Sequence, residues 1–250
     1  MQQFFADPSW FRDGKIILEG SDVNHIKNVL RMRPGEEVQI SDGSGKAYLC
    51  RVGSYAEGKA VLDIFREMDS DAELPSKIFL FQGLPKGDKM DWIVQKAVEL
   101  GAYAVVPFSA KRSIVKLDEK KAKKRQERWQ AIAKGAAEQS GRSLIPEVRQ
   151  VTTFAGALDA AADLDVILIP YELAEGMEKT TRIIGNIEPG QSVGVFIGPE
   201  GGFDETEVVQ AKERGAEAIT LGKRILRTET AGLTTLSILM YHLESRKHNL

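Results

Sequence analysis

The distribution of apolar positions divides the chain into two regions of different kind. Over the first 66 residues, short runs rich in β-branched side chains alternate with turn signals such as Pro34-Gly35 and Asp42-Gly43. Apolar residues also recur at helical spacing over residues 23–30. We therefore predict a small β-barrel with one inserted helix. Its strands are expected at residues 15–18, 38–41, 47–52 and 60–65.

The pattern changes after residues 67–76, which are acidic and poor in apolar side chains, as an interdomain linker is. Beyond them, strand-length apolar runs alternate with helical patterns, which is typical of an α/β domain with a mainly parallel sheet. Predicted strands are residues 78–81, 104–108, 166–170, 193–197 and 218–221, and predicted helices are residues 90–100, 117–138 and 177–184. We expect a barrel domain over residues 1–70 and an α/β domain over residues 71–250.

Two further helices carry specific start signals. Asp204 and Glu207 have the spacing of a capping box and precede a helix that ends near Gly215. Thr228 is placed to cap the last helix. Apolar residues cover most of the circumference of that helix, so we expect it to be buried among other elements.

Three strand-end segments combine glycines with apolar and polar residues, at residues 169–172, 197–202 and 221–230. Ligands bind at the carboxyl edge of an open parallel sheet. Exposed backbone amides and carbonyls beside apolar side chains suit a neutral heterocycle with a polar tail. A triphosphate fits poorly, because no lysine follows the glycines of residues 198–202. The alternative for this loop is a tight crossover that binds nothing.

Composition narrows the chemistry. The 250 residues carry a formal net charge of −2, which gives no global signal for nucleic acid. A single cysteine, Cys50, excludes a disulfide framework and a cysteine-based metal site, and the three histidines are scattered, so we expect no metal. No apolar run reaches the roughly 18 residues of a membrane helix. We therefore expect a soluble, cytoplasmic protein without a membrane segment.

Positive charge is concentrated locally over residues 111–128, which hold nine lysines and arginines. The second half of the predicted helix there has an apolar face. A basic stripe backed by an apolar face fits contact with a phosphate backbone. The alternative is a solvated helix face, offset by Asp118, Glu119 and Glu127.

Seven motifs, taken together, carry a family resemblance. The two strongest are Gly198-Pro-Glu-Gly-Gly202 and Leu226-Arg-Thr-Glu-Thr230, at their separation. The others are His25-Ile-Lys-Asn-Val-Leu-Arg31, Leu84-Pro-Lys-Gly-Asp-Lys-Met-Asp-Trp92, Gln95-Lys-Ala-Val-Glu-Leu-Gly101, Arg128-Trp-Gln-Ala-Ile-Ala133 and Glu138-Gln-Ser-Gly-Arg142. Over nearly its whole length, the chain resembles the RsmE family of ribosomal-RNA uridine methyltransferases, which belongs to the SPOUT class.

The resemblance implies a PUA-like β-barrel followed by an α/β SPOUT domain, whose C-terminal segment passes through a loop as a trefoil knot. Knots are nearly absent from proteins, so the alternating pattern alone predicts a plain Rossmann-like sheet. The resemblance also implies that the three loops bind S-adenosylmethionine, which leaves as S-adenosylhomocysteine. It further implies a homodimer with the active site at the subunit interface. The implied reaction methylates N3 of a uridine in the 16S ribosomal RNA of the small subunit.

Carried over residue by residue, the resemblance implies two sets of binding residues. Those expected to bind S-adenosylmethionine are Ile169, Pro170, Tyr171, Glu172, Ile197, Gly198, Pro199, Glu200, Gly201, Leu221, Gly222, Ile225, Leu226 and Thr228. Three of the glycines, at positions 198, 201 and 222, would allow the backbone to approach the adenosine closely. Those expected to contact RNA, with the basic helix, are Lys27, Arg31, Arg33, Lys86, Lys89, Arg112 and Arg142.

Two residues are candidates for catalysis. A methyl sulfonium is already electrophilic, so the enzyme must align N3 with the methyl group and manage the loss of the weakly acidic N3 proton. Arg227 is the first candidate, because a guanidinium there could stabilise the developing anion or hold the phosphate of a flipped nucleotide. Its alternative is a loop brace to Glu229 or Glu200. Glu200 could orient the ligand, act as the base or brace the loop.

The sequence departs from the family pattern at two positions, and it leaves two alternative functions to consider. Gln3 stands where the family usually has an arginine, which weakens one expected RNA contact, and Lys223 stands where a proline is frequent. A second hypothesis keeps fold and ligand but changes the target to a ribose 2′-hydroxyl or a guanine. A third is a non-catalytic RNA-binding module, against which the intact segments 198–202 and 226–230 argue.

Overall fold

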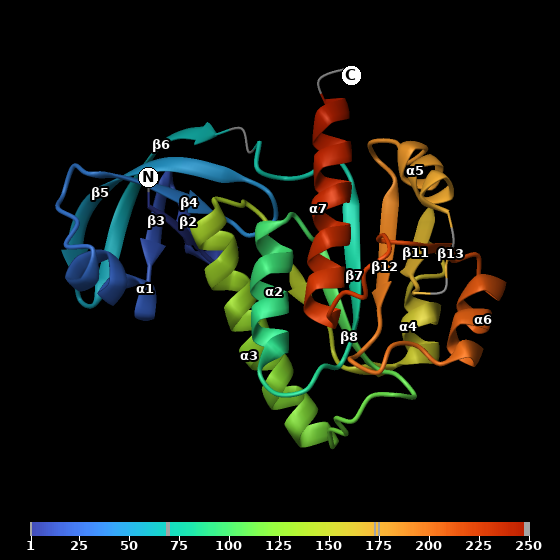
Figure 1. The fold of residues 1–250 in the computed structure, drawn as a ribbon. Coiled ribbons are helices and arrows are strands. Elements are labelled where there is room, and N and C mark those ends of the chain that lie inside the picture. Colours follow the sequence, from blue (N-terminus) through green and yellow to red (C-terminus); the bar gives the residue numbers. More distant parts are fainter. Residues whose placement is uncertain (1, 69–70, 173, 175, 248–250) are drawn as a thin grey trace. The chain divides into compact units, whose positions relative to one another are not determined.

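Two separate sheets, one in each of two units, organise the chain (Figure 1). The computed structural model describes residues 2–68, 71–172, 174 and 176–247. The first unit comprises Met1–Glu73 and Ala137–Ile145, and the second comprises Leu74–Ala136 and Pro146–Leu250. Residues 69 and 70 of the predicted linker lie outside the described residues.

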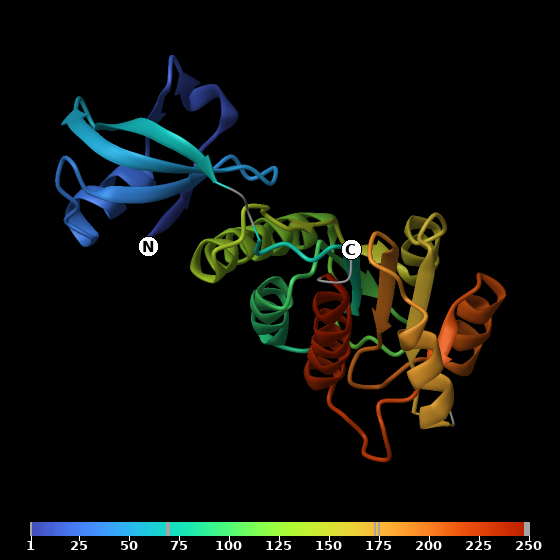
Figure 2. The same cartoon turned by 90° about the horizontal axis from the view of Figure 1, so that it is seen from above.

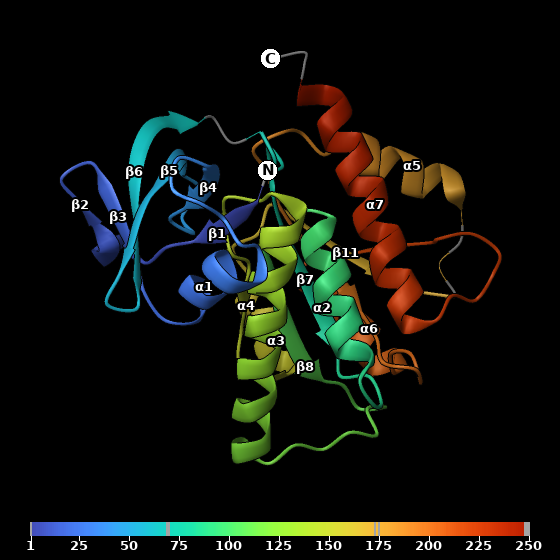
Figure 3. The same cartoon turned by 90° about the vertical axis from the view of Figure 1, so that its left-hand side faces the viewer.

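The first unit is built on a six-stranded sheet in the order β1-β4-β5-β6-β3-β2 (Figure 3). Its strands are β1 (Gln3–Phe5), β2 (Phe11–Arg12), β3 (Lys15–Leu18), β4 (Glu37–Ser41), β5 (Ala47–Ala56) and β6 (Lys59–Met68). All pairs are antiparallel except β1 with β4. The four predicted strands are confirmed, whereas β1 and β2 are too short to show a period in the sequence.

Alternating side chains of these strands form one core, to which β1 adds Phe4 and β3 adds Ile16 and Leu18. The predicted helix is in fact two short elements, α1 (Ser21–Asn24) and a π-helical turn over His25–Val29. Ile26 from that turn is fully buried in the same core. The unit therefore has its own hydrophobic centre, as an independent domain requires.

A buried ion pair ties separate stretches of the first unit together. The side chain of Arg142 is only 3% exposed, and its guanidinium donates to the carboxylate of Glu73 at 2.6 Å. The same carboxylate accepts from the backbone amides of Ser143 and Leu144 at 3.1 and 3.2 Å. The prediction that Arg142 contacts RNA is therefore wrong, because the charge that a phosphate would need is enclosed and already neutralised.

Gln3, one of the departures from the family pattern, is also enclosed. Its side-chain amide donates to the backbone carbonyl of Arg142, and its Oε1 accepts from Gln39 at 3.0 Å. Gln3 is 8% exposed, so it lies in the interior beside the ion pair. In this chain the residue braces strand β1 and is not available to RNA.

We expect Glu73→Ala to lower the free energy of unfolding of the first unit by about 3 kcal/mol, because it removes a carboxylate that pairs with a buried guanidinium and accepts from two backbone amides. Glu37→Ala is the matched control, since Glu37 pairs with Arg51 on the surface at 3.0 Å. It should cost less than about 1 kcal/mol. Hydrogen exchange of β4 and β5 in urea measures both, and equal losses for the two variants would contradict the assignment.

The second unit contains a parallel sheet of seven strands in the order β10-β8-β7-β12-β11-β13, with β9 beside β8. The strands are β7 (Lys77–Gly83), β8 (Ala104–Ser109), β9 (Glu147–Val148), β10 (Thr152–Thr153), β11 (Val166–Pro170), β12 (Ser192–Ile197) and β13 (Glu217–Ile219). The helices are α2 (Lys89–Glu99), α3 (Glu119–Ser140), α4 (Phe154–Ala160), α5 (Met177–Gly185), α6 (Glu205–Glu213) and α7 (Thr228–Lys247). The predicted parallel α/β architecture is confirmed.

Helices cover both faces of this sheet. On one face an aromatic cluster joins α4 and α6 to the strands, and within it the rings of Phe81 and Phe196 stack at 4.3 Å. On the other face α2 and α7 lie side by side against β7 and β12 (Figures 1 and 2). The capping box predicted for α6 is confirmed, with Asp204 and Glu207 each bonding the other's backbone amide.

Helix α7 differs from its prediction. Leu236, Leu239 and Leu243 are fully buried, but Tyr241 is 76% exposed and Ile238 is 38% exposed. The expectation that the helix is enclosed on all sides is therefore wrong for the chain as the structure describes it. One face of α7 presents apolar side chains to the outside.

Candidate active site

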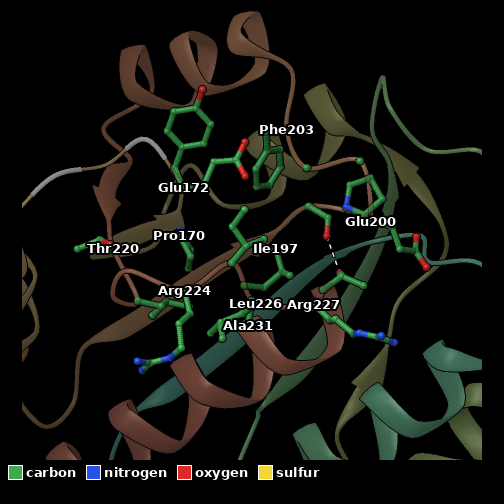
Figure 4. A pocket seen from close by; sticks show the side chains of 18 of the residues that line it. Pro170, Glu172, Ile197, Glu200, Phe203, Thr220, Arg224, Leu226, Arg227 and Ala231 are labelled. Atoms are coloured by element: carbon green, nitrogen blue, oxygen red, sulfur yellow. Dashed lines mark hydrogen bonds between the residues drawn. The ribbon is translucent and has the colours of Figure 1, made fainter.

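The three predicted strand-end segments meet in one cavity of about 530 Å³ (Figure 4). They meet because β11 lies between β12 and β13 in the sheet, so that the carboxyl ends of all three strands open at one edge. The lining residues are Lys89, Pro170, Tyr171, Glu172, Ile197, Gly198, Pro199, Glu200, Gly201, Gly202, Phe203, Thr220, Leu221, Gly222, Arg224, Ile225, Leu226, Arg227, Thr228 and Ala231.

All but one of the predicted cofactor-binding residues lie on this lining. The exception is Ile169, which is fully buried in the aromatic cluster on the α4 and α6 face. The prediction that Ile169 binds the cofactor is therefore wrong. Successive side chains of a strand point to opposite faces of the sheet, and that of Ile169 points into the core. Ile225 is the opposite case, since its side chain is 86% exposed at the rim and takes no part in the core.

The glycines of the 198–202 loop serve the protein's own packing. A Cβ at position 198 would lie 3.0 Å from the carbonyl carbon of Gly202, and one at position 201 would lie 3.0 Å from the Cβ of Arg112. The space that these glycines leave is therefore filled by protein. Gly222 differs, because its φ is positive at 105° and a Cβ at its position would meet nothing within 4 Å.

A neighbouring glycine, Gly83 at the end of β7, fits the same loop. A Cβ there would lie 2.8 Å from the nitrogen and the Cδ of Pro199. No side chain except hydrogen can occupy that space unless the loop moves. Gly83 therefore holds the loop close to the sheet, and sequence reasoning missed it because a lone glycine at a strand end gives no distinct signal.

Thr228 links two of the loops. Its hydroxyl donates to the backbone carbonyl of Gly198 at 2.5 Å and accepts from the side-chain amide of Gln82 at 2.9 Å. The prediction that Thr228 caps the last helix is therefore wrong, since α7 already begins at Thr228 and the hydroxyl is directed to the neighbouring loop. The residue joins the start of α7 to the end of β12.

Lys89, at the start of α2, holds two carboxylates of the cavity wall. Its Nζ lies 2.9 Å from Glu200 and 3.3 Å from Glu229. Glu200 also accepts from the backbone amide of Lys86 at 3.1 Å. Burial acts to raise the pKa of Glu200, but the hydrogen bonds from Lys89 and the backbone outweigh it, and the pKa lies below its usual value. Glu200 is therefore ionised at neutral pH.

Arg227 has no ion pair or side-chain hydrogen bond within the part of the chain that the structure describes. The alternative role for Arg227, a brace to Glu229 or Glu200, is wrong because Lys89 binds both carboxylates. In Figure 4 the side chains of Glu200 and Arg227 lie on one side of the cavity, and Arg224 lies on the other. The guanidinium of Arg227 is thus exposed and available to a ligand.

Of the predicted RNA contacts, Lys89 lines the cavity and Arg112 packs against Gly201 of the glycine loop. Arg112 donates to the backbone carbonyl of Gly201 at 3.3 Å and lies 3.7 Å from Asp204. Its side chain is 47% exposed, so it supports the glycine loop and still faces solvent. Lys86 contributes its backbone amide to Glu200, and its side chain is exposed.

The other RNA candidates lie elsewhere. Lys27, Arg31 and Arg33 are exposed on the first unit, where the Nζ of Lys27 lies 5.5 Å from the ring centre of Tyr55. On α3 the exposed lysines are Lys120, Lys121, Lys123 and Lys124. The contact of these residues with RNA stays a prediction.

Metal and membrane signals are both missing from the described residues. No group of three or more His, Cys, Asp and Glu side chains there could hold a metal ion. None of the helices in the described ranges combines the length and the apolar character that crossing a membrane requires.

A parallel sheet with a cavity between its strand-end loops and its last helix, preceded by a small β unit, is an architecture of SPOUT-class RNA methyltransferases. Comparison with known proteins agrees. Residues 72–240 match the family of RNA methyltransferase domains, and residues 18–65 match the family of RNA methyltransferase PUA domains.

Relatives and solved structures cover nearly the whole chain. Ribosomal RNA small subunit methyltransferase E of Bacillus subtilis is 41% identical over 91% of this chain and 90% of its own. The structure of the protein of that name from Neisseria gonorrhoeae, bound to S-adenosyl methionine, has a TM-score of 0.82 and 36% identity, covering 96% of this chain and 97% of its own. A methyltransferase of Legionella pneumophila, in complex with SAM, has a TM-score of 0.84 and 30% identity, with 96% of both chains covered.

The chain belongs to the ribosomal RNA small subunit methyltransferase E family. Its α/β SPOUT architecture is thereby established, as the sequence resemblance implied. The trefoil knot stays a prediction.

We expect Gly83→Ala to lower the free energy of unfolding of the second unit by about 1–3 kcal/mol, as overpacking does, because the added methyl group displaces Pro199. Gly135→Ala is the matched control, since nothing lies within 4 Å of a Cβ at that position of α3. It should stabilise the chain by about 0.5–1 kcal/mol, because alanine favours helix more than glycine. Urea unfolding checks both, and a neutral Gly83→Ala would show that the loop tolerates displacement.

Proposed function

We propose that this chain transfers the methyl group of S-adenosylmethionine to N3 of a uridine in the 16S ribosomal RNA of the small subunit. The family supports the reaction class, and its relatives are named as methyltransferases of small-subunit ribosomal RNA. The observation that carries the proposal is the cavity between the three loops, with the guanidinium of Arg227, which pairs with no described carboxylate, at its wall. The cavity suits a methyl donor, and a cation beside it suits the negative charge that develops on the substrate.

The residues present fit S-adenosylmethionine. The cavity has the size of a small-molecule site, which is about 300–1,000 Å³. Ile197, Leu221 and Leu226 provide apolar surface for the adenine ring, and the backbone of the 198–202 loop and of Gly222 provides donors and acceptors for its edge. Glu172 adds a polar group at the opposite loop.

When bound, S-adenosylmethionine supplies an electrophilic methyl group on a sulfonium. The chain's own task is to align the uridine and to stabilise the negative charge that develops on N3 as its proton leaves. We assign that stabilisation to Arg227. Glu200 is an ionised carboxylate with a lowered pKa, hence a weak base, and Lys89 fixes its position. We therefore assign Glu200 to orienting the ligand and the loop.

We further propose that the enzyme is a cytoplasmic homodimer, with its active site at the subunit interface. Support comes from the apolar side chains that α2 and α7 present to the outside: Trp92 is 45% exposed, and Ile238 and Tyr241 lie on the open face of α7. The two helices pack against each other, and exposed apolar side chains of this kind are what an interaction surface offers. A second copy is the occupant that the family implies.

The RNA is proposed to contact Lys27, Arg31 and Arg33 on the first unit, and Lys86, Arg112 and the basic face of α3 on the second. These side chains are exposed and positively charged, as contacts to phosphate require. Lys89 is proposed to act mainly by holding the two carboxylates of the cavity wall and less by contacting RNA. Its hydrogen bond to Glu200 raises its pKa, so the ammonium stays charged and keeps both ion pairs.

We expect Arg227→Ala to reduce methyl transfer from S-adenosylmethionine to small subunits lacking the modification by about 10²–10³-fold, the effect of removing one group that stabilises a developing anion. Labelled methyl transfer, with the nucleoside identified by mass spectrometry, measures it. Arg214→Ala is the control, because that arginine pairs with Asp159 on the surface. It should transfer at the wild-type rate.

Three outcomes would contradict parts of this function. A methylated nucleoside other than N3-methyluridine would overturn the target atom and favour the ribose or guanine alternative. Binding of S-adenosylmethionine without transfer by the wild-type chain would favour a non-catalytic RNA-binding module. Full activity of Arg227→Ala would remove Arg227 from the catalytic residues.

We expect Ile238→Asp with Tyr241→Asp to convert the dimer to a monomer, because two carboxylates would have to be buried without partners. Light scattering after gel filtration gives the mass directly. Val209→Asp is the control, since Val209 is 53% exposed on α6 and should leave the dimer intact. A wild-type monomer, or a double variant that stays dimeric, would show that this face is not the interface.

A further inference from the structure

We propose that Gln82, which does not touch the cavity, is a positioning residue for its binding loops. The inference rests on the proposed function and concerns the chain of hydrogen bonds that runs from Gln82 through Thr228 to Gly198. Gln82 is fully buried near the end of β7, in register with Ile197 of β12. It is therefore a neutral polar group set inside the sheet, directly behind the wall that Thr228 and Gly198 form.

The direction of the hydrogen bonds is set by the number of protons available. The hydroxyl of Thr228 has one proton, which it donates to the carbonyl of Gly198 at 2.5 Å. It can therefore only accept from its other neighbour, and the amide of Gln82 donates to it at 2.9 Å. The same amide nitrogen donates to the carbonyl of Gly83 at 3.0 Å. If the amide were reversed, its oxygen would face two other acceptors. Only the orientation described here allows all three hydrogen bonds to form.

This arrangement leaves one polar atom unsatisfied. The Oε1 of Gln82 is buried and accepts no hydrogen bond from the described residues. It points toward Gly232 of α7, where an added Cβ would lie 3.5 Å away. A buried acceptor without a partner is unfavourable for stability. An apolar residue of the same length would avoid that loss but would also remove the two hydrogen bonds that the amide donates, so the net stability of the sheet does not by itself explain the glutamine.

Positioning of the loops does explain it. Gly198 begins the loop after β12, and Thr228 begins α7 directly after Arg227. A donor fixed in the central sheet orients the Thr228 hydroxyl, and that hydroxyl holds the two segments together. Gln82 thus sets the spacing of two of the three segments that line the cavity. A loop held in its bound geometry binds with a smaller loss of conformational entropy.

The test compares Gln82→Met, which keeps the length but removes the donor, with Thr228→Val, which keeps the shape but removes the hydroxyl. Calorimetry measures the Kd for S-adenosylmethionine, and hydrogen exchange measures the protection of residues 198–203 without ligand. We expect each variant to raise the Kd about tenfold and to speed the exchange. The double variant should have the same Kd as each single variant, because either substitution alone interrupts the hydrogen bonds that run from Gln82 through Thr228 to Gly198.

Leu239→Ala is the control for a purely structural role. Leu239 is fully buried on α7, away from the cavity lining, so its truncation should lower Tm without changing the Kd. Gln82→Met should show the reverse, with a smaller change in Tm than Leu239→Ala and a weaker affinity, because the loss of the two donated hydrogen bonds is partly offset by removal of the unsatisfied acceptor. This opposite response separates positioning from general stability.

Unchanged exchange in Gln82→Met, an affinity within twofold of the wild type, or multiplying effects in the double variant would each overturn the proposal. A wild-type chain that does not bind S-adenosylmethionine would instead overturn the proposed function. The exchange measurement needs no ligand, so it would still decide whether Gln82 holds the loop.

Discussion

The cavity depends on the contact of the 198–202 loop with the end of β7 and the start of α7. Three segments that are far apart in sequence converge there, and the packing leaves no room for a side chain at Gly83 or at Gly198. The hydroxyl of Thr228 then joins the loop to α7. Because interiors are close-packed, a small displacement at this point moves two walls of the cavity together.

Charge in the cavity wall is arranged around one lysine. Lys89 pairs with both Glu200 and Glu229, and the guanidinium of Arg227 has no carboxylate partner among the described residues. An arginine at the same place with a bound carboxylate would have a weaker attraction for an anion. Lys89 braces the loop, and Arg227 is available to a ligand. Because different residues perform these two tasks, the site can hold its loop rigidly and still offer positive charge to a substrate.

Much of the fold could be predicted from the sequence, because periodicity and caps are local. The strands β7, β8, β11 and β12 and the helices α2, α3, α5 and α6 lie close to their predicted positions, and the capping box at Asp204 is formed as expected. The short strands and α4 escaped because a few residues show no period. The SPOUT class was predicted from the family resemblance. The alternation of strands and helices alone would have predicted a plain Rossmann-like sheet.

The segments that form the site can be recognised in the sequence, since glycines and polar residues at the ends of apolar strands stand out without coordinates. The task of each side chain in the site depends on the folded structure. It enclosed Arg142 with Glu73, turned Ile169 into the core, gave the bracing role to Lys89 and placed Gln82 behind Thr228. The reason is physical: a charge or an amide acts through its neighbours and its burial, and both are set by residues distant in the chain.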